Sequence, residues 1–291
     1  MSKIGKNFLL KIIIISVVLT GLNIIFNPIE RFELLKYNSK SIYVYNLTDK
    51  KEELSLNATE KRAPASLTKI MTTFVALESK INLSRKISID INSYRRAINN
   101  NASVAGFVTN ENITFRDLLY GTMLPSGGEC ANTISNYITL HNDDFIALMN
   151  KRVESLGLKN TRFTTADGLD ENDQFSTAKD IAIILEEALK DGNFRAIFTK
   201  KEYTSTSTSN HPKGLYMEST VFKKLKKYQY NGFEIVGGKS GTTNKAGMCW
   251  AILARKNGKE YIVVTMGANE NNLDNAEDGQ IVDTLKILEN L

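Results

Sequence analysis

The sequence predicts an α+β fold in which an antiparallel sheet is flanked by helices. Apolar, β-branched segments lie near both ends of the 291-residue chain, and segments of helical periodicity lie between them. Near the C-terminus, Asn257-Gly258 joins two apolar runs, which is the strongest short-range signal for a β-hairpin. We therefore expect the first and last strands of the chain to meet in one sheet.

The expected strands lie in two groups. Ser41–Asn46 and Glu53–Leu56 are predicted to pair across a turn at Thr48–Lys51. Gly247–Lys256 and Glu260–Met266 are the two runs of the predicted hairpin. No internal repeat or low-complexity linker divides the chain, and no second domain is expected after the hairpin.

Helices are expected mainly in the middle of the sequence. One follows Pro64-Ala65 and a second follows Pro125-Ser-Gly-Gly128, each with apolar residues at helical spacing. Asp143 and Asp144 are expected to cap a third, and Ser176 is a plausible N-cap for a fourth that ends near Gly192. The polar segment 93–112 shows little periodicity. A terminal amphipathic helix is expected to place these residues on one side: Ile281, Val282, Leu285 and Leu288.

The N-terminus has the pattern of an export signal. Lys3, Lys6 and Lys11 precede an apolar run, Ile12–Phe26. The run is shorter than the ~20 residues of a comfortable membrane helix unless the apolar residues just before Lys11 are included. It ends without a convincing small-x-small cleavage site. We favour an uncleaved membrane anchor, and a removed signal peptide is the alternative.

The same pattern predicts where the rest of the chain lies. Basic residues stay on the cytoplasmic side, so everything after Asn27 is expected outside the cell membrane. We therefore divide the chain into an anchor or signal segment, 1–30, and one extracytoplasmic domain, 31–291.

Composition excludes several classes of function. The net charge of +5 suits an anionic cell wall or membrane surface, but the basic residues are scattered, so no nucleic-acid partner is expected. Cys130, Cys249, His141 and His211 have no metal-ligand spacing, and we predict neither a metal nor another cofactor. The two cysteines could pair in an exported protein, although two buried free thiols are favoured.

The most informative segment is Ser66-Leu-Thr-Lys69, at the start of a predicted helix. Residues three apart lie on one helical face, so the Ser66 hydroxyl and the Lys69 amine are neighbours. Lysine can take the proton of a serine only if its pKa falls below ~10.4, which burial and a second nearby cation achieve. The pattern alone is weak evidence, because Ser176-Thr-Ala-Lys179 also fits it.

Two later segments complete a candidate catalytic set. Ser126-Gly127-Gly128 offers a second hydroxyl that can relay a proton to a leaving amine. Gly237-Gly-Lys239-Ser-Gly241-Thr242, just before the hairpin, offers on an edge strand a cation for a carboxylate and a small residue beside which a substrate backbone can lie. The backbone N–H groups of Thr242 and Ser66 can form an oxyanion hole. Each segment alone is more often an ordinary turn, and their order gives them weight.

Together these segments resemble the active site of the serine D-Ala-D-Ala carboxypeptidases, the low-molecular-mass penicillin-binding proteins. The resemblance covers Ser41–Leu291. It is carried by the three catalytic segments and by the stretches around them: Ala63–Thr72, Asp117–Ser126, Thr161–Phe163, Gly168-Leu169 and Ser176–Asp180.

The resemblance implies a β-lactamase/penicillin-binding transpeptidase-like fold, with a helical lobe beside the antiparallel sheet. It implies that Ser66 is the nucleophile, Lys69 its base and Ser126 a proton relay. The substrate would be a peptidoglycan stem peptide ending in D-Ala-D-Ala, and β-lactams would acylate Ser66. The substrate carboxylate would bind at these residues: Lys239, Ser240, Gly241 and Thr242.

Two departures from the family pattern stand out. Ser240 replaces the usual threonine and keeps its hydroxyl, whereas Gly128 stands where the family usually has asparagine.

Two alternative functions remain open. A serine β-lactamase would need a deacylating base such as the glutamate of a Glu-x-x-Leu-Asn segment, and none lies between Ser126 and Lys239. A non-catalytic wall-peptide binder or β-lactam sensor is motivated by Gly128.

Overall fold

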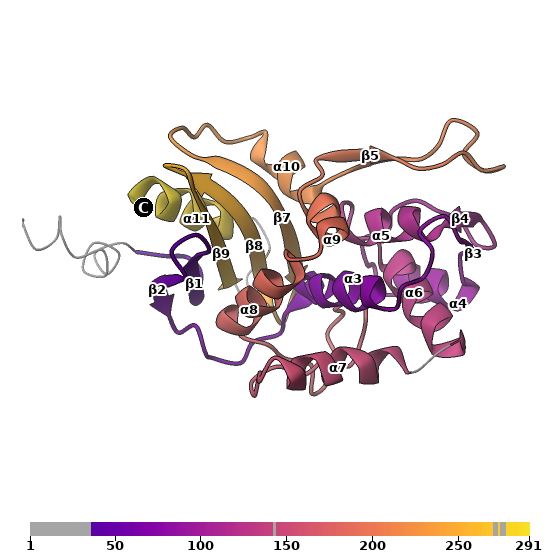
Figure 1. The fold of residues 1–291 in the computed structure, drawn as a ribbon, viewed down its shortest axis with the longest axis horizontal. Helices are drawn as coiled ribbons and strands as arrows, with labels where there is room; N and C mark the ends of the chain where they lie inside the picture. Colours follow the sequence, from indigo (N-terminus) through magenta and orange to yellow (C-terminus); the bar gives the residue numbers. More distant parts are fainter. Residues whose placement is uncertain (1–35, 142–143, 270–272, 274–277) are drawn as a thin grey trace, which may run out of the picture.

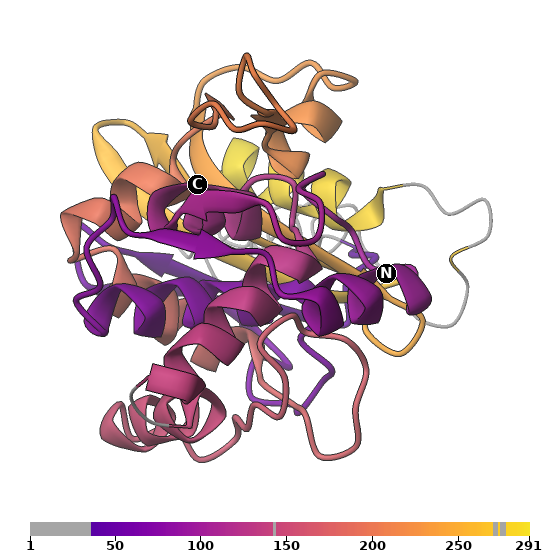
Figure 2. The ribbon, with the colours of Figure 1, turned by 90° about the vertical axis from the view of Figure 1, so that its right-hand side faces the viewer.

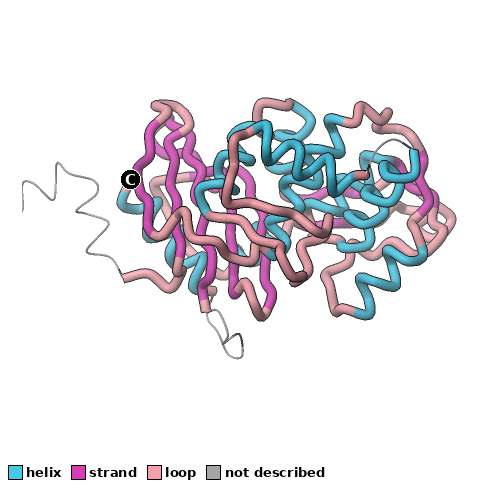
Figure 3. Tube along the Cα trace, turned by 90° about the horizontal axis from the view of Figure 1, so that it is seen from below, coloured by secondary structure: helices cyan, strands magenta, loops and turns pink. Residues whose placement is uncertain are grey.

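A computed structural model describes residues 36–141, 144–269, 273 and 278–291. Strands gather at one end of the molecule and most helices at the other (Figures 1 and 3). The predicted N-terminal anchor, within 1–30, lies outside the described residues. In the described part of the chain, no helix is both long and apolar enough to span a bilayer.

The main sheet has five strands in the order β2-β1-β9-β8-β7. The strand β1 pairs antiparallel with β9, with Ser41 opposite Met266, so the first and last strands meet as predicted. The hairpin through Asn257-Gly258 is also confirmed. The bounds of the five strands are β1 Ser41–Asn46, β2 Lys51–Leu56, β7 Glu234–Thr243, β8 Gly247–Lys256 and β9 Lys259–Ala268.

Both faces of this sheet are covered, which explains the apolar run in β8. Trp250 and Ile252 belong to a core cluster with α10 (Thr220–Leu225) and α11 (Gly279–Asn290) on one face. Alternate residues such as Ala251 face the larger cluster that includes α8 and the helical lobe. Side chains alternate between the two faces of a strand, so a central strand covered on both sides is apolar throughout.

The helical lobe is built around α3, which begins after the short 3₁₀ helix η1 that carries Ser66 (Figures 1 and 2). Nine of the 11 residues of α3 are buried, so this helix is a core element rather than a surface one. The helices are η1 Ala65–Leu67, α3 Thr68–Glu78, α4 Ile91–Asn99, α5 Phe115–Met123, α6 Gly128–His141, α7 Phe145–Ser155, α8 Ala178–Ala188 and α9 Gly192–Phe198. The short strands are β3 Lys86–Ser88 with β4 Asn112–Thr114, and β5 Glu202–Thr204 with β6 Tyr216–Glu218.

Several boundaries differ from the sequence predictions. Thr177, not Ser176, is the N-cap of α8, because Ser176 forms a β-bridge with Arg62 instead. The helix α8 ends at Ala188, and Gly192 begins a separate helix, α9. Val282 of α11 is 40% exposed and does not share the buried face of Ile281.

The polar segment near residues 93–112 contains a helix that periodicity did not reveal. The helix α4 begins after Asp90, whose side chain accepts a hydrogen bond from the Ser93 N–H, and it buries only Ser93 and Ala97. Asp144 caps α7 as expected, while Asp143 lies outside the described residues.

Candidate active site

Ser66 lies in the short 3₁₀ helix that leads into α3, wedged between β7 and the loop before α8. Ala65, just before it, has a φ of 48°, a conformation that non-glycine residues seldom adopt. A Cβ built on Gly241 of β7 would lie 2.9 Å from the Ser66 backbone nitrogen, so a side chain larger than hydrogen does not fit there. Strained backbone of this kind is concentrated at functional sites.

Lys69 is buried and lies one helical turn from Ser66. Its Nζ lies 3.0 Å from Ser66 Oγ and also donates to the backbone oxygen of Asp167. Burial lowers the pKa of Lys69 to about 8, against the charges of Asp167 and Glu129, which raise it. The predicted neighbourhood of hydroxyl and amine is therefore confirmed, and burial has the predicted effect on the amine.

Asp167 was not singled out from the sequence, although its backbone oxygen accepts a hydrogen bond from Lys69. Its carboxylate accepts from Asn132 Nδ2 at 2.7 Å and from the Leu169 N–H at 3.1 Å. Arg96 Nε lies 3.5 Å from the same carboxylate. Burial alone would raise the pKa of Asp167, but Lys69 and these hydrogen bonds outweigh burial and lower it. Asp167 therefore carries a buried negative charge beside Lys69.

Ser126 and Lys239 form the second pair of the site. Lys239 is fully buried, and its Nζ donates to Ser126 Oγ at 2.8 Å and to the Ser240 carbonyl at 2.7 Å. Burial, with repulsion from Lys69, holds the pKa of Lys239 well below its usual value. Ser126 has a φ of 67°, so it too is a non-glycine residue in the left-handed region.

The remaining residues of the third segment also belong to β7, which is an edge strand of the sheet. Ser240 Oγ lies 2.7 Å from the hydroxyl of Thr220, which begins α10 and was not singled out from the sequence. Thr242 is exposed, and Gly241 is buried against Ser66. All seven predicted residues thus lie at the junction of η1, α3, β7 and the turn before α6.

A residue that sequence analysis missed, Glu129, directly follows the second segment. Gly128 begins α6, where a Cβ would lie 3.4 Å from the side chains of Ala97 and Ala102. The next residue, Glu129, is buried, and its Oε1 accepts from the backbone N–H groups of Ala105 and Gly106. Burial raises the pKa of Glu129. This carboxylate fixes the segment that packs on the Ser126 turn.

The missed residues had different signals. Asp167 directly precedes Gly168-Leu169, which belongs to the family resemblance. However, Lys69 donates to the backbone oxygen of Asp167, and every residue has such an oxygen, so the side-chain pattern does not mark this contact. Asn132 lies one turn after Gly128 on α6, a spacing visible only once the helix is placed. No group of three or more potential metal ligands occurs among the described residues.

The fold and the site define a class of protein, the DD-peptidases. The structure matches that of a mutant of the Streptomyces K15 DD-transpeptidase with a TM-score of 0.78 and 28% identity, over 88% of this chain and 98% of that one. A family model described as D-alanyl-D-alanine carboxypeptidase matches residues 35–270, and the chain belongs to this family, peptidase S11.

Curated relatives agree with this membership. The D-alanyl-D-alanine carboxypeptidase DacF of Bacillus subtilis is 29% identical over 255 residues, which are 87% of this chain and 64% of that protein. The D-alanyl-D-alanine carboxypeptidase of Streptomyces sp. K15 is 30% identical, over 70% of this chain and 72% of that one. DacC of Escherichia coli K12 is 32% identical, over 73% of this chain. The chain thus spans 64% of the Bacillus protein and 52% of the E. coli protein.

Proposed function

We propose that this protein is a serine-type D-Ala-D-Ala carboxypeptidase that removes the terminal D-Ala from peptidoglycan stem peptides through an acyl-enzyme on Ser66. The observation that carries the proposal is the contact between Ser66 Oγ and Lys69 Nζ, 3.0 Å apart, with Lys69 buried and its pKa lowered to about 8. An amine of this pKa is neutral in a useful fraction of molecules near neutral pH, so it can act as a base.

In the proposed acylation, neutral Lys69 takes the proton of Ser66 while Oγ attacks the carbonyl carbon of the penultimate D-Ala. The backbone N–H groups of Ser66 and Thr242 would stabilise the oxyanion. The C–N bond then breaks, and the leaving amine of D-Ala receives a proton through Ser126. Water hydrolyses the resulting ester, which releases the shortened peptide and restores the Ser66 hydroxyl.

The terminal carboxylate of the substrate would bind at Lys239, Ser240, Gly241 and Thr242. Burial and the nearby Lys69 lower the pKa of Lys239. A carboxylate entering the site favours the charged amine, so substrate binding would raise the pKa of Lys239. The Ser126 hydroxyl, 2.8 Å from Lys239 Nζ, links this carboxylate site to the leaving group.

The same arrangement leads us to propose that β-lactams acylate Ser66. A β-lactam carries a reactive amide next to a carboxylate, as the D-Ala-D-Ala terminus does. The adduct is expected to persist, since the segment between Ser126 and Lys239 lacks the Glu-x-x-Leu-Asn pattern of a deacylating base.

We also propose that residues 1–30 tether the catalytic domain, 31–291, to the outer face of the cell membrane. Three lysines followed by the apolar run Ile12–Phe26 support this orientation. Cell fractionation tests it: the full chain should sediment with membranes, and a variant beginning at Arg31 should not. When the full chain is expressed, recovery in the soluble fraction of a product that lacks residues 1–30 would indicate a cleaved signal peptide instead.

The activity is tested by incubating the full chain with diacetyl-Lys-D-Ala-D-Ala and, separately, with benzylpenicillin. Wild type should release D-Ala and gain the mass of one penicillin, and Ser66→Ala should do neither. Ser176→Ala is the matched control, because Ser176 begins the other Ser-x-x-Lys segment, and it should keep both activities. An adduct that survives in Ser66→Ala would refute the choice of nucleophile.

Two other results would select an alternative function. Rapid turnover of benzylpenicillin without a lasting adduct would indicate a β-lactamase. Slow acylation without any release of D-Ala would indicate a wall-peptide binder or β-lactam sensor.

A further inference from the structure

The described part of the chain begins at Lys36, beside α11. The buried carboxylate of Asp283 in this helix accepts from the backbone N–H groups of Asn38 and Ser39. Lys286, also in α11, donates to the backbone oxygen of Lys36 at 3.0 Å. The first described residues are therefore fixed against α11, and a tether formed by the segment before them would join the domain at this helix.

The helix α10 lies next to α11 on the same face of the sheet. Lys224 of α10 pairs with Asp278, the N-cap of α11, at 2.7 Å, and both helices pack into one core cluster. Val221 and Leu225 of α10 are buried against the sheet. Lys223 lies on the opposite side of this helix, so its exposed side chain points away from the sheet.

The end of α10 carries more positive charge than nearby carboxylates balance. Four of the five residues in 223–227 are lysines, and two of them form ion pairs, one with Asp278 and one with Glu218. The other two, Lys223 and Lys227, are exposed and form no ion pair with a described residue. Their charges are therefore available to an anionic partner.

Apolar and aromatic side chains lie beside these lysines. Tyr230 and Phe233, on the loop after α10, are stacked with ring centroids 5.2 Å apart and are partly exposed. On the outward side of α11, Val282 is 40% exposed, and it is accompanied by Lys286 and by one exposed carboxylate, Glu289. Lysines next to partly exposed aromatic side chains are typical of protein surfaces at a lipid–water interface. The α10–α11 face is defined here by Lys223, Lys227, Tyr230, Val282 and Lys286.

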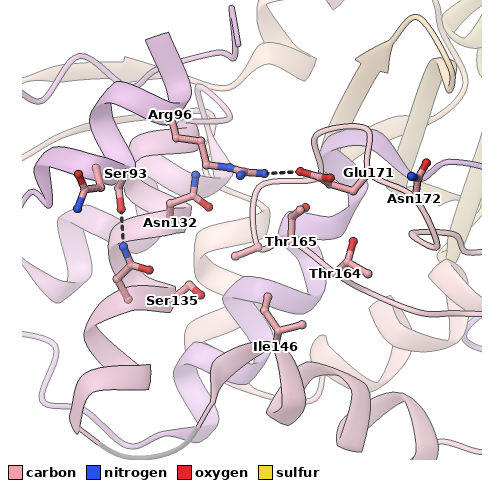
Figure 4. A pocket seen from close by; sticks show the side chains of 12 residues that line it. Ser93, Arg96, Asn132, Ser135, Ile146, Thr164, Thr165, Glu171 and Asn172 are labelled. Atoms are coloured by element: carbon pink, nitrogen blue, oxygen red, sulfur yellow. Dashed lines mark hydrogen bonds and ion pairs between the residues drawn. The ribbon is translucent and has the colours of Figure 1, made fainter. Parts of the chain in front are cut away.

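The catalytic residues lie on the other face of the sheet. Side chains alternate between the two faces along β7. Ser240 contacts Thr220 of α10, whereas Lys239 points to the helical lobe, where it donates to Ser126. The polar pocket between α4, α6 and the loop before α8 belongs to the same lobe (Figure 4). A surface that covers the α10–α11 face therefore leaves the catalytic residues and this pocket uncovered.

We propose that the α10–α11 face docks on a membrane surface that carries anionic lipid headgroups. The lysines contact lipid phosphates, and Tyr230 and Val282 lie at the level of the headgroups. A membrane is favoured over other polyanions because a tether that joins the domain at α11 holds this face close to the bilayer, at a high effective concentration. This inference rests on the membrane tether proposed above.

The test measures how accessible the face is in the full chain reconstituted in vesicles. Gln229 is exposed next to Tyr230, and Gln229→Cys adds one accessible thiol, because both native cysteines are buried. A bulky, membrane-impermeant maleimide should label it about tenfold more slowly in vesicles of phosphatidylcholine with phosphatidylglycerol than in phosphatidylcholine alone. Salt at about 1 M should remove this difference. Ser84→Cys, exposed before β3 in the helical lobe, should be labelled equally in both.

Charge variants test whether the lysines cause the protection. Lys223→Gln with Lys227→Gln should restore most of the labelling of Gln229→Cys, since each lysine removed weakens docking by about fivefold. Lys151→Gln with Lys159→Gln is the matched control, because it removes the same charge from exposed positions in α7 and the loop after it. The control should keep the slow labelling, and both pairs of substitutions should leave D-Ala release unchanged.

The possible failures give different results. Equal labelling of Gln229→Cys in the two kinds of vesicle, or slow labelling that persists without Lys223 and Lys227, would overturn the docking. Protection by soluble polyglycerol phosphate, without protection by anionic vesicles, would assign the face to an anionic wall polymer and would overturn it too. A full chain that does not float with either kind of vesicle would overturn the tether itself, and D-Ala release tests the catalytic activity separately.

Discussion

At the scale of single residues, the protonation state of Lys69 controls the proposed chemistry. Burial lowers its pKa to about 8, so the fraction of Lys69 that is neutral increases as the pH rises through that value. We therefore expect the rate of acylation by benzylpenicillin to increase between about pH 7 and 9 and then level off. Quenched-flow mass spectrometry of the adduct measures this rate.

The corresponding variant is Lys69→Arg, which should abolish acylation at every pH because arginine keeps its proton. A profile that is flat from about pH 6 to 10 would show that Lys69 is not the base.

Asp167 provides a second prediction, since its charge raises the pKa of Lys69. Asp167→Asn removes the charge but keeps the backbone oxygen that binds Lys69. The Lys69 pKa should fall, and the midpoint of the acylation profile should move to lower pH. Asp170→Asn is the control, because Asp170 lies in the same loop but bonds Thr243. A loss of rate without a shifted midpoint would mean that Asp167 has only a structural role.

The sequence predicted the local part of this site and not the distant part. Ser66 and Lys69 are neighbours because residues three apart lie on the same face of a helix, so their spacing in the sequence is enough to predict the contact. The Lys69–Asp167 contact joins residues 98 positions apart through a backbone oxygen, so no side-chain pattern marks it. Likewise, Ser126 was predicted as a proton relay, but nothing in the sequence pairs it with Lys239 on β7, which donates the hydrogen bond that the structure shows.

At the scale of elements, the loop before α8 packs directly on η1 at Gly168. Gly168 has a φ of +81°, and a Cβ there would lie 2.0 Å from the Ala65 backbone oxygen. Gly168→Ala therefore combines an unfavourable backbone conformation with a clash next to the nucleophile. We expect it to lower the free energy of unfolding by at least about 3 kcal/mol and to slow acylation.

Gly157→Ala is the matched control for this prediction. Gly157, after α7, has a φ of +71°, but no atom lies within 4 Å of its built Cβ. It should cost about 1 kcal/mol and leave acylation unchanged. Urea unfolding and penicillin acylation measure both effects, and equal losses in the two variants would show that the contact with Ala65 is unimportant.

Element prediction succeeded where hydrophobic periodicity was strong. The strand β8 and the hairpin were evident because both faces of β8 are buried and its sequence is apolar throughout. The helix α4 was missed because it buries only Ser93 and Ala97 and is held by an Asp90 cap and by α6. Ser176 was misassigned because serine is by itself the better N-cap of the two adjacent hydroxyl residues, whereas the bridge to Arg62 holds Ser176 outside the helix and leaves Thr177 as the cap.

At the scale of the whole molecule, one core cluster runs through both the helical lobe and one face of the sheet. Cys130 of α6 and Cys249 of β8 both belong to it, and both are buried free thiols, as the sequence favoured. Because this core is continuous, we expect the catalytic part of the chain to unfold as a single cooperative unit. Separate unfolding of lobe and sheet would require this shared core to divide.

The two thiols report on this behaviour from different elements. In the native protein neither should react with an aromatic disulfide reagent, since burial excludes the reagent and raises the pKa of Cys130. In urea both should become reactive over the same concentration range, as followed by mass spectrometry of peptides containing each cysteine. Reaction of Cys130 at a clearly lower urea concentration than Cys249 would show that the helical lobe opens first. In that case 31–291 would have to be divided into two folding units.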